Sequence, residues 1–269
     1  MTTDVLPNEV SILARTGAAS IAYRYQGGTI PGVVFLPGFR SDMTGTKASA
    51  LAQWCRARGQ ACLRFDYGGH GLSTGDFGAG TIGSWADDAL AVFDSATQGP
   101  QILVGSSMGG WIMLLLALRR PERVAGLVGI AAAPDFTEDL IWPALTPDQR
   151  ARLAADGAVQ VPSADGEELY PITGALIEDG RRHLLLRGPL RLVCPVRLLH
   201  GLADADVPWR TALKLAESLA GTEVVVTFIN DGDHRLSRSM DLERMFAAVA
   251  ELTLLPQPPA VSRAASPTR

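Results

Sequence analysis

Hydrophobic and polar positions follow two alternating patterns along most of the chain. Short continuous runs of β-branched and apolar residues, such as residues 32–36 before Pro37 and Gly38, are typical of strands buried on both faces. Between these runs the apolar residues recur at helical spacing, as in residues 47–58, which stop at Gly59. This repeated order of strand and helix predicts an α/β fold, with a mostly parallel, doubly wound sheet and right-handed crossovers.

The alternation is interrupted once, and the interruption predicts an insertion. The expected strands are 20–25, 32–36, 61–65, 102–104, 124–130, 196–200 and 224–229, and the expected helices are 47–58, 84–96, 108–119, 210–219 and 240–254. Residues from about 135 to 190 fit neither pattern, and a segment of that length is too long for a plain loop. We therefore expect a single domain over residues 1–255 with a small helical cap at 135–190. The tail, residues 256–269, is rich in Pro, Ser and Ala and is expected to be disordered.

Composition narrows the classes of function. The chain has 269 residues, of which 47% are hydrophobic, so one domain with a sizeable core is expected. The net charge is -4 and no basic run occurs, which argues against binding to nucleic acid or to an anionic membrane. Three cysteines without CxxC spacing argue against a disulfide framework or a zinc site. We expect neither a metal nor a cofactor.

The sequence also predicts where the protein resides. The first ten residues carry acidic side chains early and lack the apolar run of a secretory signal or the arginines of a transit peptide. The longest strongly apolar stretch, residues 111–118, is far too short to span a bilayer. These features predict a soluble cytoplasmic protein without stable membrane insertion, and they leave its oligomeric state open.

A serine at a sharp turn is the first candidate for chemistry. Residues 105–109 have the GxSxG pattern of a nucleophile elbow, with an expected strand before them and an apolar helix after them. Small residues must flank such a turn, and Gly105 and Gly109 do so. Ser107 would then project at the positive end of the helix as the nucleophile. The alternative, a glycine-rich helix start with a capping serine, fits Ser106 better.

The base and the acid are expected in later loops, in the order that this fold uses. A serine hydroxyl needs a base, and His234 lies in a loop directly after the last expected strand. The acid should follow the preceding strand, where Asp204 and Asp206 are both available. We favour Asp204, because the pattern His-Gly-x-x-Asp-x-x-Val-Pro places the acid there, with Asp206 as the fallback. His200 is expected to satisfy backbone groups.

The oxyanion donors and the acyl groove complete the expected site. The backbone N–H groups of Met108 and Phe39 are the expected oxyanion donors, since they follow the nucleophile and the 32–36 strand. If the cap covers the site, its apolar side chains would either line an acyl groove or only pack the cap onto the body. They are Phe136, Leu140, Ile141 and Trp142. His70, in a glycine-rich loop after the 61–65 strand, is expected to be mainly structural.

Several stretches together resemble one known family. They are residues 35–38, 43–48, 64–67, 101–111 (QILVGSSMGGW), 197–201, 207–209 and 233–235, and they are similar to the mitochondrial palmitoyl-protein thioesterases, also described as mycophenolic acid acyl-glucuronide esterases. The resemblance implies the α/β-hydrolase fold and cleavage of S-acyl thioesters, including those of S-acylated proteins, or of acyl esters. It matches the family's catalytic serine, aspartate and histidine to Ser107, Asp204 and His234. A bacterial member of the family is expected.

Two alternatives stay open from the sequence. The first is a general carboxylesterase with no role on thioesters; peptidase, lipase and dehalogenase functions are weaker, and a dehalogenase would need an aspartate where Ser107 stands. The second is a non-catalytic binding protein with a hydrolase fold. Such proteins usually lose a member of the triad, whereas serine, acid and histidine are all present here.

Overall fold

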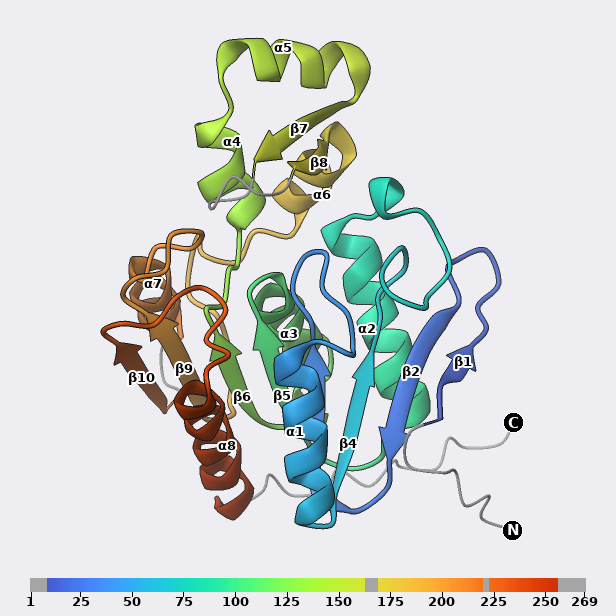
Figure 1. Ribbon diagram of the computed structural model, residues 1–269, viewed down its shortest axis with the longest axis vertical. Coiled ribbons are helices and arrows are strands. Elements are labelled where there is room, and N and C mark those ends of the chain that lie inside the picture. Colours follow the sequence, from blue (N-terminus) through green and yellow to red (C-terminus); the bar gives the residue numbers. More distant parts are fainter. Residues whose placement is uncertain (1–8, 163–168, 220–222, 256–269) are drawn as a thin grey trace, which may run out of the picture.

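The computed structural model describes residues 9–162, 169–219 and 223–255, so the first eight residues and the tail that we expected to be disordered lie outside the described residues. Its central element is one sheet of eight strands in the order β1-β2-β4-β3-β5-β6-β9-β10 (Figure 1). The pairs β1–β2 and β2–β4 are antiparallel, and every other pair is parallel. The strands are β1 (Ser11–Leu13), β2 (Ile21–Gln26), β3 (Thr29–Leu36), β4 (Gln60–Phe65), β5 (Gln101–Ser106), β6 (Val124–Ile130), β9 (Val196–Gly201) and β10 (Val224–Ile229).

Helices cover both faces of this sheet, as the strand and helix alternation predicted. The helices α1 and α8 lie on one face, and α2, α3 and α7 lie on the other (Figure 1). Their bounds are α1 (Thr46–Ala57), α2 (Ile82–Ala96), α3 (Met108–Arg119), α7 (Arg210–Ser218) and α8 (Ser239–Leu254). The helix α3 is buried along almost its whole length, since it packs against β3, β5 and β6 of the sheet and against α2. None of the described helices is long and apolar enough to cross a membrane.

The strand order creates a crevice at one place on the sheet. The chain passes from β3 to β4 on one side and then returns to form β5 on the other side of β3. Loops at the carboxyl ends of β3 and β5 therefore diverge, and this is the position where open α/β sheets bind ligands. Leu36 pairs with Gly105 at that edge. The expected oxyanion loop and the nucleophile elbow consequently start next to each other.

The segment between β6 and β9 stands above this edge of the sheet (Figure 1). It contains a π-helical turn (Thr137–Ile141), the helices α4 (Trp142–Ala144), α5 (Pro147–Asp156) and α6 (Gly174–Arg182), and the strands β7 (Ala158–Pro162) and β8 (Leu169–Thr173). The helices agree with our expectation for this segment. The antiparallel pair β7–β8 was not expected from the sequence.

Candidate active site

Ser107 lies at a sharp turn between β5 and α3. Its backbone has φ of 54°, a left-handed conformation that is strained for a residue with a side chain. The main chain holds it there, since Ser107 N donates to Ile130 O at 2.9 Å and Ser107 O accepts from Gly110 N at 2.8 Å. A Cβ on Gly105 would lie 2.4 Å from Gly109 O, and one on Gly109 would lie 2.1 Å from Leu36 O. The glycines of the motif are therefore required by close backbone contacts.

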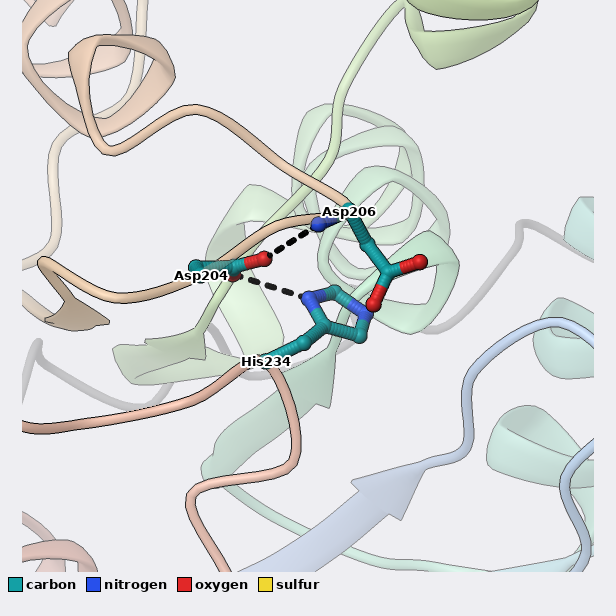
Figure 2. A group of neighbouring side chains, drawn as sticks. All are labelled: Asp204, Asp206 and His234. Carbon is teal, nitrogen blue, oxygen red and sulfur yellow. Dashed lines mark hydrogen bonds and ion pairs between the residues drawn. The ribbon is translucent and has the colours of Figure 1, made fainter. Parts of the chain in front are cut away.

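His234 connects the serine to an acid. It lies in the loop after β10, and its Nε2 is 3.1 Å from Ser107 Oγ. Its Nδ1 is 2.8 Å from Asp204 Oδ2, and Figure 2 shows the ring facing that carboxylate. Because the carboxylate can only accept, Nδ1 carries the proton and Nε2 is free to accept the serine proton. The His234 side chain is 23% exposed, whereas that of Asp204 is fully buried.

Asp204 is held by bonds to both of its oxygens. Oδ1 accepts from the backbone N–H groups of Asp206 at 2.9 Å and Val207 at 2.8 Å. Oδ2 faces His234 and also lies 3.3 Å from His200 Nε2. Burial alone would raise the pKa of Asp204, but the hydrogen bonds from His200, His234 and Val207 outweigh it and hold the pKa well below its usual value. The carboxylate therefore stays ionised.

Asp206, the fallback acid, occupies a different position. Its carboxylate is exposed and lies beside the His234 ring, while its backbone binds Asp204 (Figure 2). Ligand atoms of Asp204, Asp206 and His234 fall within 4.8 Å of one another. Oδ1 of Asp204 already accepts hydrogen bonds from the backbone, and Oδ2 of Asp204 is hydrogen-bonded to His234 Nδ1. The arrangement thus matches a serine–histidine–aspartate chain, and it brings together the three residues that the sequence suggested.

His200 makes more contacts than the sequence indicated. The residue is buried, and its Nε2 donates to Val207 O at 2.9 Å, as expected for a histidine that satisfies the backbone. The same Nε2–H also faces Asp204 Oδ2. His200 thus connects the strand end, the acid loop and the carboxylate.

The loop after β3 brings Phe39 to the elbow. A Cβ on Gly38 would lie 3.2 Å from Ser106 O and 3.4 Å from Ser107 Cβ, so the glycine lets the loop pass close to the elbow without a tight contact. Met108 is the first residue of α3, and its N–H has no acceptor within the helix. Phe39 and Met108 both line a cavity with Ser107. Their backbone N–H groups are therefore available near the nucleophile.

A buried histidine, His70, forms a hydrogen bond with the backbone of this loop. Arg40, with φ of 58°, donates its backbone N–H to His70 Nε2 at 3.3 Å. His70 Nδ1 must then carry the proton, and it donates to Gly68 O at 3.2 Å. Burial lowers the pKa of His70, which favours this neutral form. His70 therefore has the structural role expected for its loop, and the element that it supports is the expected oxyanion loop.

An apolar cavity of about 280 Å³ opens beside Ser107 under the cap. Three of the four expected cap residues, Phe136, Leu140 and Ile141, line it. Trp142 is not among the lining residues; its ring instead contacts the guanidinium groups of Arg150 and Arg181, whose central carbons are 4.8 and 4.6 Å from the ring centroid. The β7–β8 pair adds four lining residues that the sequence did not suggest, namely Val161, Pro162, Tyr170 and Ile172.

A second cavity, of about 380 Å³, shares Phe39, Ser107, His234 and Arg235 with the first. Its remaining lining comes from the ends of β3 and β5, from the loop after β3, from the start of α1 and from the loop after His234, and most of the lining residues have polar or charged side chains. Ser107 thus lies where an apolar and a polar space meet. No pattern in the sequence indicated the polar space, since its lining combines three segments, residues 35–48, 106–107 and 234–237, that are far apart along the chain.

Known proteins resemble this chain over most of its length. A family model described as "Serine aminopeptidase, S33" matches residues 31–161. The human mitochondrial palmitoyl-protein thioesterase ABHD10 is 38% identical over 244 residues, which cover 90% of this chain and 79% of that protein.

Two solved structures extend the similarity to the fold. A protein from Agrobacterium vitis S4 has 43% identity and a TM-score of 0.86, covering 91% of this chain and 98% of that one. Mouse alpha/beta hydrolase domain-containing protein 10 has 38% identity and a TM-score of 0.85, with the same coverage. The resemblance inferred from the motifs and the α/β-hydrolase fold are therefore confirmed. The human relative is described as mitochondrial, so the cytoplasmic location stays a prediction.

Proposed function

This chain belongs to the α/β-hydrolase family of the palmitoyl-protein thioesterase ABHD10, and we propose that it cleaves acyl thioesters or esters with Ser107, His234 and Asp204 as its catalytic triad. The chain is a serine hydrolase by this membership. The observation that carries the proposed triad is the continuous chain of hydrogen bonds from Asp204 through His234 to Ser107, at the mouth of an apolar cavity.

The geometry supports acyl transfer in two steps. Ser107 Oγ attacks the acyl carbonyl while His234 Nε2 accepts its proton, and ionised Asp204 stabilises the imidazolium that forms. The backbone N–H groups of Phe39 and Met108 stabilise the oxyanion. As the C–S or C–O bond breaks, His234 gives the proton to the departing sulfur or oxygen, which leaves as a thiol or an alcohol. A water molecule then attacks the acyl-enzyme while His234 takes its proton and returns it to Ser107 Oγ, and the acid is released.

The acyl group fits the apolar cavity beneath the cap. Phe136, Leu140 and Ile141 give this cavity an apolar wall next to Ser107. Its volume of about 280 Å³ lies just below the range for ligand pockets, roughly 300–1,000 Å³. That size favours acyl groups of short or medium length, and a palmitoyl chain would extend past the enclosed space.

Relatives suggest which leaving groups to consider. The name of the ABHD10 relatives states that they act on palmitoyl-proteins, so S-acylated cysteine is one substrate class for this chain, and the acyl-glucuronide esters implied by the family resemblance are another. Curated esterases that act on pimeloyl-[acyl-carrier protein] methyl ester also match part of the chain. A general carboxylesterase that shows no preference for thioesters is the alternative.

Hydrolysis of a chain-length series separates these functions. The series contains p-nitrophenyl esters and acyl thioesters with matched acyl groups, tested with the wild type and Ser107→Ala. We expect the wild type to cleave short and medium chains and the variant to be inactive, and the ratio of thioester to ester turnover then distinguishes thioesterase from esterase. An inactive wild type would instead support a non-catalytic binding protein, and turnover by Ser107→Ala would refute the proposed nucleophile.

A further inference from the structure

The polar cavity beside Ser107 has the position of a leaving-group site. If the acyl chain occupies the apolar cavity, the group on the other side of the scissile bond must lie in the second space that reaches Ser107. This second cavity is about 380 Å³ in volume and is lined by Ser107, His234, Lys47 and Arg235 among others. The chemistry of these side chains then decides which leaving group fits.

Two cations in the lining are not neutralised by a carboxylate. Lys47 Nζ donates to the backbone oxygen of Arg235. This bond occupies one of the three N–H donors of the ammonium group, and because the acceptor is a neutral carbonyl it leaves the positive charge of Lys47 without a counterion. Arg235 is an exposed residue and lines both cavities. Within residues 9–162, 169–219 and 223–255, no ion pair joins either side chain to an acidic group. Both charges are thus available to a ligand.

The other charged residues of this cavity have contacts of their own. Arg40 donates from its guanidinium to Leu169 O at 3.0 Å and lies over the Tyr170 ring, so it is directed to the cap. Asp42 Oδ1 accepts from both the backbone N–H and the hydroxyl of Thr44, each at 2.6 Å. The three cationic residues of the lining, Arg40, Lys47 and Arg235, outnumber its one carboxylate, Asp42, so the lining has an excess of positive charge.

The surroundings of Lys47 indicate that its ammonium lacks a close partner. The pKa of Lys47 is lowered to about 8, mainly by burial and also by the charge of Arg235, while the charges of Asp233 and Asp241 act in the opposite direction. Those two carboxylates are engaged elsewhere: Asp233 accepts from Leu236 N, and Asp241 pairs with Arg238 and Arg244. The helix α1 also begins next to this lysine without a side-chain cap, which adds positive potential. An anion bound in the cavity would favour the protonated form of Lys47 and raise its pKa again.

We propose that Lys47 and Arg235 form a leaving-group subsite that selects thiols and alcohols carrying an anionic group, a carboxylate or a phosphate. The proposal rests on the proposed function and specifies its leaving group. The anionic group of the substrate binds Lys47 and Arg235 while the scissile carbonyl lies at Ser107. Neutral leaving groups of the same size lose these contacts.

Matched thioesters test the subsite directly. The substrates are S-butanoyl thioesters of 3-mercaptopropionate, of its neutral amide, and of 2-mercaptoethyl phosphate, with thiol release followed by a chromogenic reagent. We expect the wild type to show a kcat/KM at least about tenfold higher for one or both anions than for the amide, as charge-assisted hydrogen bonds produce. The anion with the larger preference identifies the group that the subsite binds.

Variants of the two cations give the decisive comparison. Lys47→Met and Arg235→Gln should each reduce the ratio of anionic to neutral kcat/KM several-fold, and the double variant should abolish it. Arg152→Gln is the matched control, because Arg152 is an exposed arginine on the cap that lines neither cavity. The ratio is taken within each protein sample, so a loss of folded protein does not change it.

The outcomes separate the subsite from the proposed function. If the wild type cleaves all three thioesters equally, or if both variants keep its preference, the subsite is refuted while the hydrolase function stands. If neither these thioesters nor p-nitrophenyl butyrate is cleaved, the proposed function fails and the subsite fails with it.

Discussion

Replacing Asp204 with asparagine should inactivate the enzyme through the tautomer of His234. The backbone N–H groups of Asp206 and Val207 donate to Oδ1 at 2.9 and 2.8 Å. The asparagine oxygen must take that position, because the opposite orientation would lose two hydrogen bonds, about 1 kcal/mol each, and would set an NH₂ group against two donors. The NH₂ group is thereby forced into the position of Oδ2.

That position faces two histidines, and both are mismatched with an NH₂ group. His234 Nδ1, 2.8 Å away, would have to become an acceptor, which moves its proton to Nε2 and prevents Nε2 from taking the proton of Ser107. His200 Nε2, 3.3 Å away, already donates to Val207 O and would meet a second donor. We expect kcat to fall by about 10⁴, as the same change does in a serine protease triad, which equals about 5.5 kcal/mol in the barrier.

The assay compares Asp204→Asn with Asp206→Asn on p-nitrophenyl butyrate at pH 8. The second variant keeps the backbone N–H that binds Asp204 and changes only an exposed carboxylate, so kcat should stay within about threefold of the wild type, the range of small surface effects. A far-ultraviolet spectrum checks that both variants are folded. More than a tenth of wild-type activity in Asp204→Asn, or an equal loss in Asp206→Asn, would refute the assignment of the acid.

Three further predictions follow from the site. Replacing Ile141 with phenylalanine narrows the apolar cavity, so the p-nitrophenyl ester series should lose activity on longer acyl chains first; an unchanged chain-length profile would show that the cavity does not hold the acyl group. His70→Ala removes the acceptor of the Arg40 N–H and should lower kcat roughly tenfold at similar KM, a smaller effect than the loss of an oxyanion donor itself. His70→Gln should recover part of this activity. If His70→Ala is as active as the wild type, His70 does not support this loop. The folded-state pKa of Asp204 lies below its ordinary value of 3.8, so its ionised form stabilises the protein above about pH 4, and this contribution is lost on acidification. Urea unfolding should therefore give the wild type a larger free energy of unfolding than Asp204→Asn at pH 7, and the difference should shrink below about pH 4. A difference that does not change with pH would contradict this.

The sequence predicted most of the sheet because its strands are buried on both faces. All seven expected strands and all five expected helices are present, with ends that differ by no more than a few residues. The strand β1 was missed because it has three residues at the edge of the sheet and leaves little apolar pattern. The β7–β8 pair was missed because it packs in the cap, where prolines and glycines obscure the alternation.

The candidate triad was predictable because each member follows the end of a predicted strand. The carboxyl ends of parallel strands meet at one edge, so Ser107, Asp204 and His234 were expected close together before any geometry was known. The cap was harder, because the π-helical turn Thr137–Ile141 changes the direction of the side chains that follow it. Leu140 and Ile141 lie within this turn and line the cavity, whereas Trp142 follows it and packs against the guanidinium groups of Arg150 and Arg181.

The polar cavity could not be predicted from local patterns. Lys47 stands at the start of α1 and Arg235 lies 188 positions later in the chain, and only the packing of the loop after β10 against α1 brings them together. Both residues lie in stretches that carry the family resemblance, 43–48 and 233–235, but the resemblance gave neither of them a role. Sites made by such distant contacts need a three-dimensional structure.

Detection of the acyl-enzyme tests the proposed mechanism most directly. The wild type is mixed with p-nitrophenyl butyrate, quenched in acid during turnover and analysed by intact and peptide mass spectrometry, with Ser107→Ala in parallel. We predict a butanoyl group on the peptide containing Ser107 in the wild type and none in the variant, which should be inactive. Turnover by Ser107→Ala, or a butanoyl group on a different residue that forms and decays with turnover, would contradict Ser107 as the nucleophile.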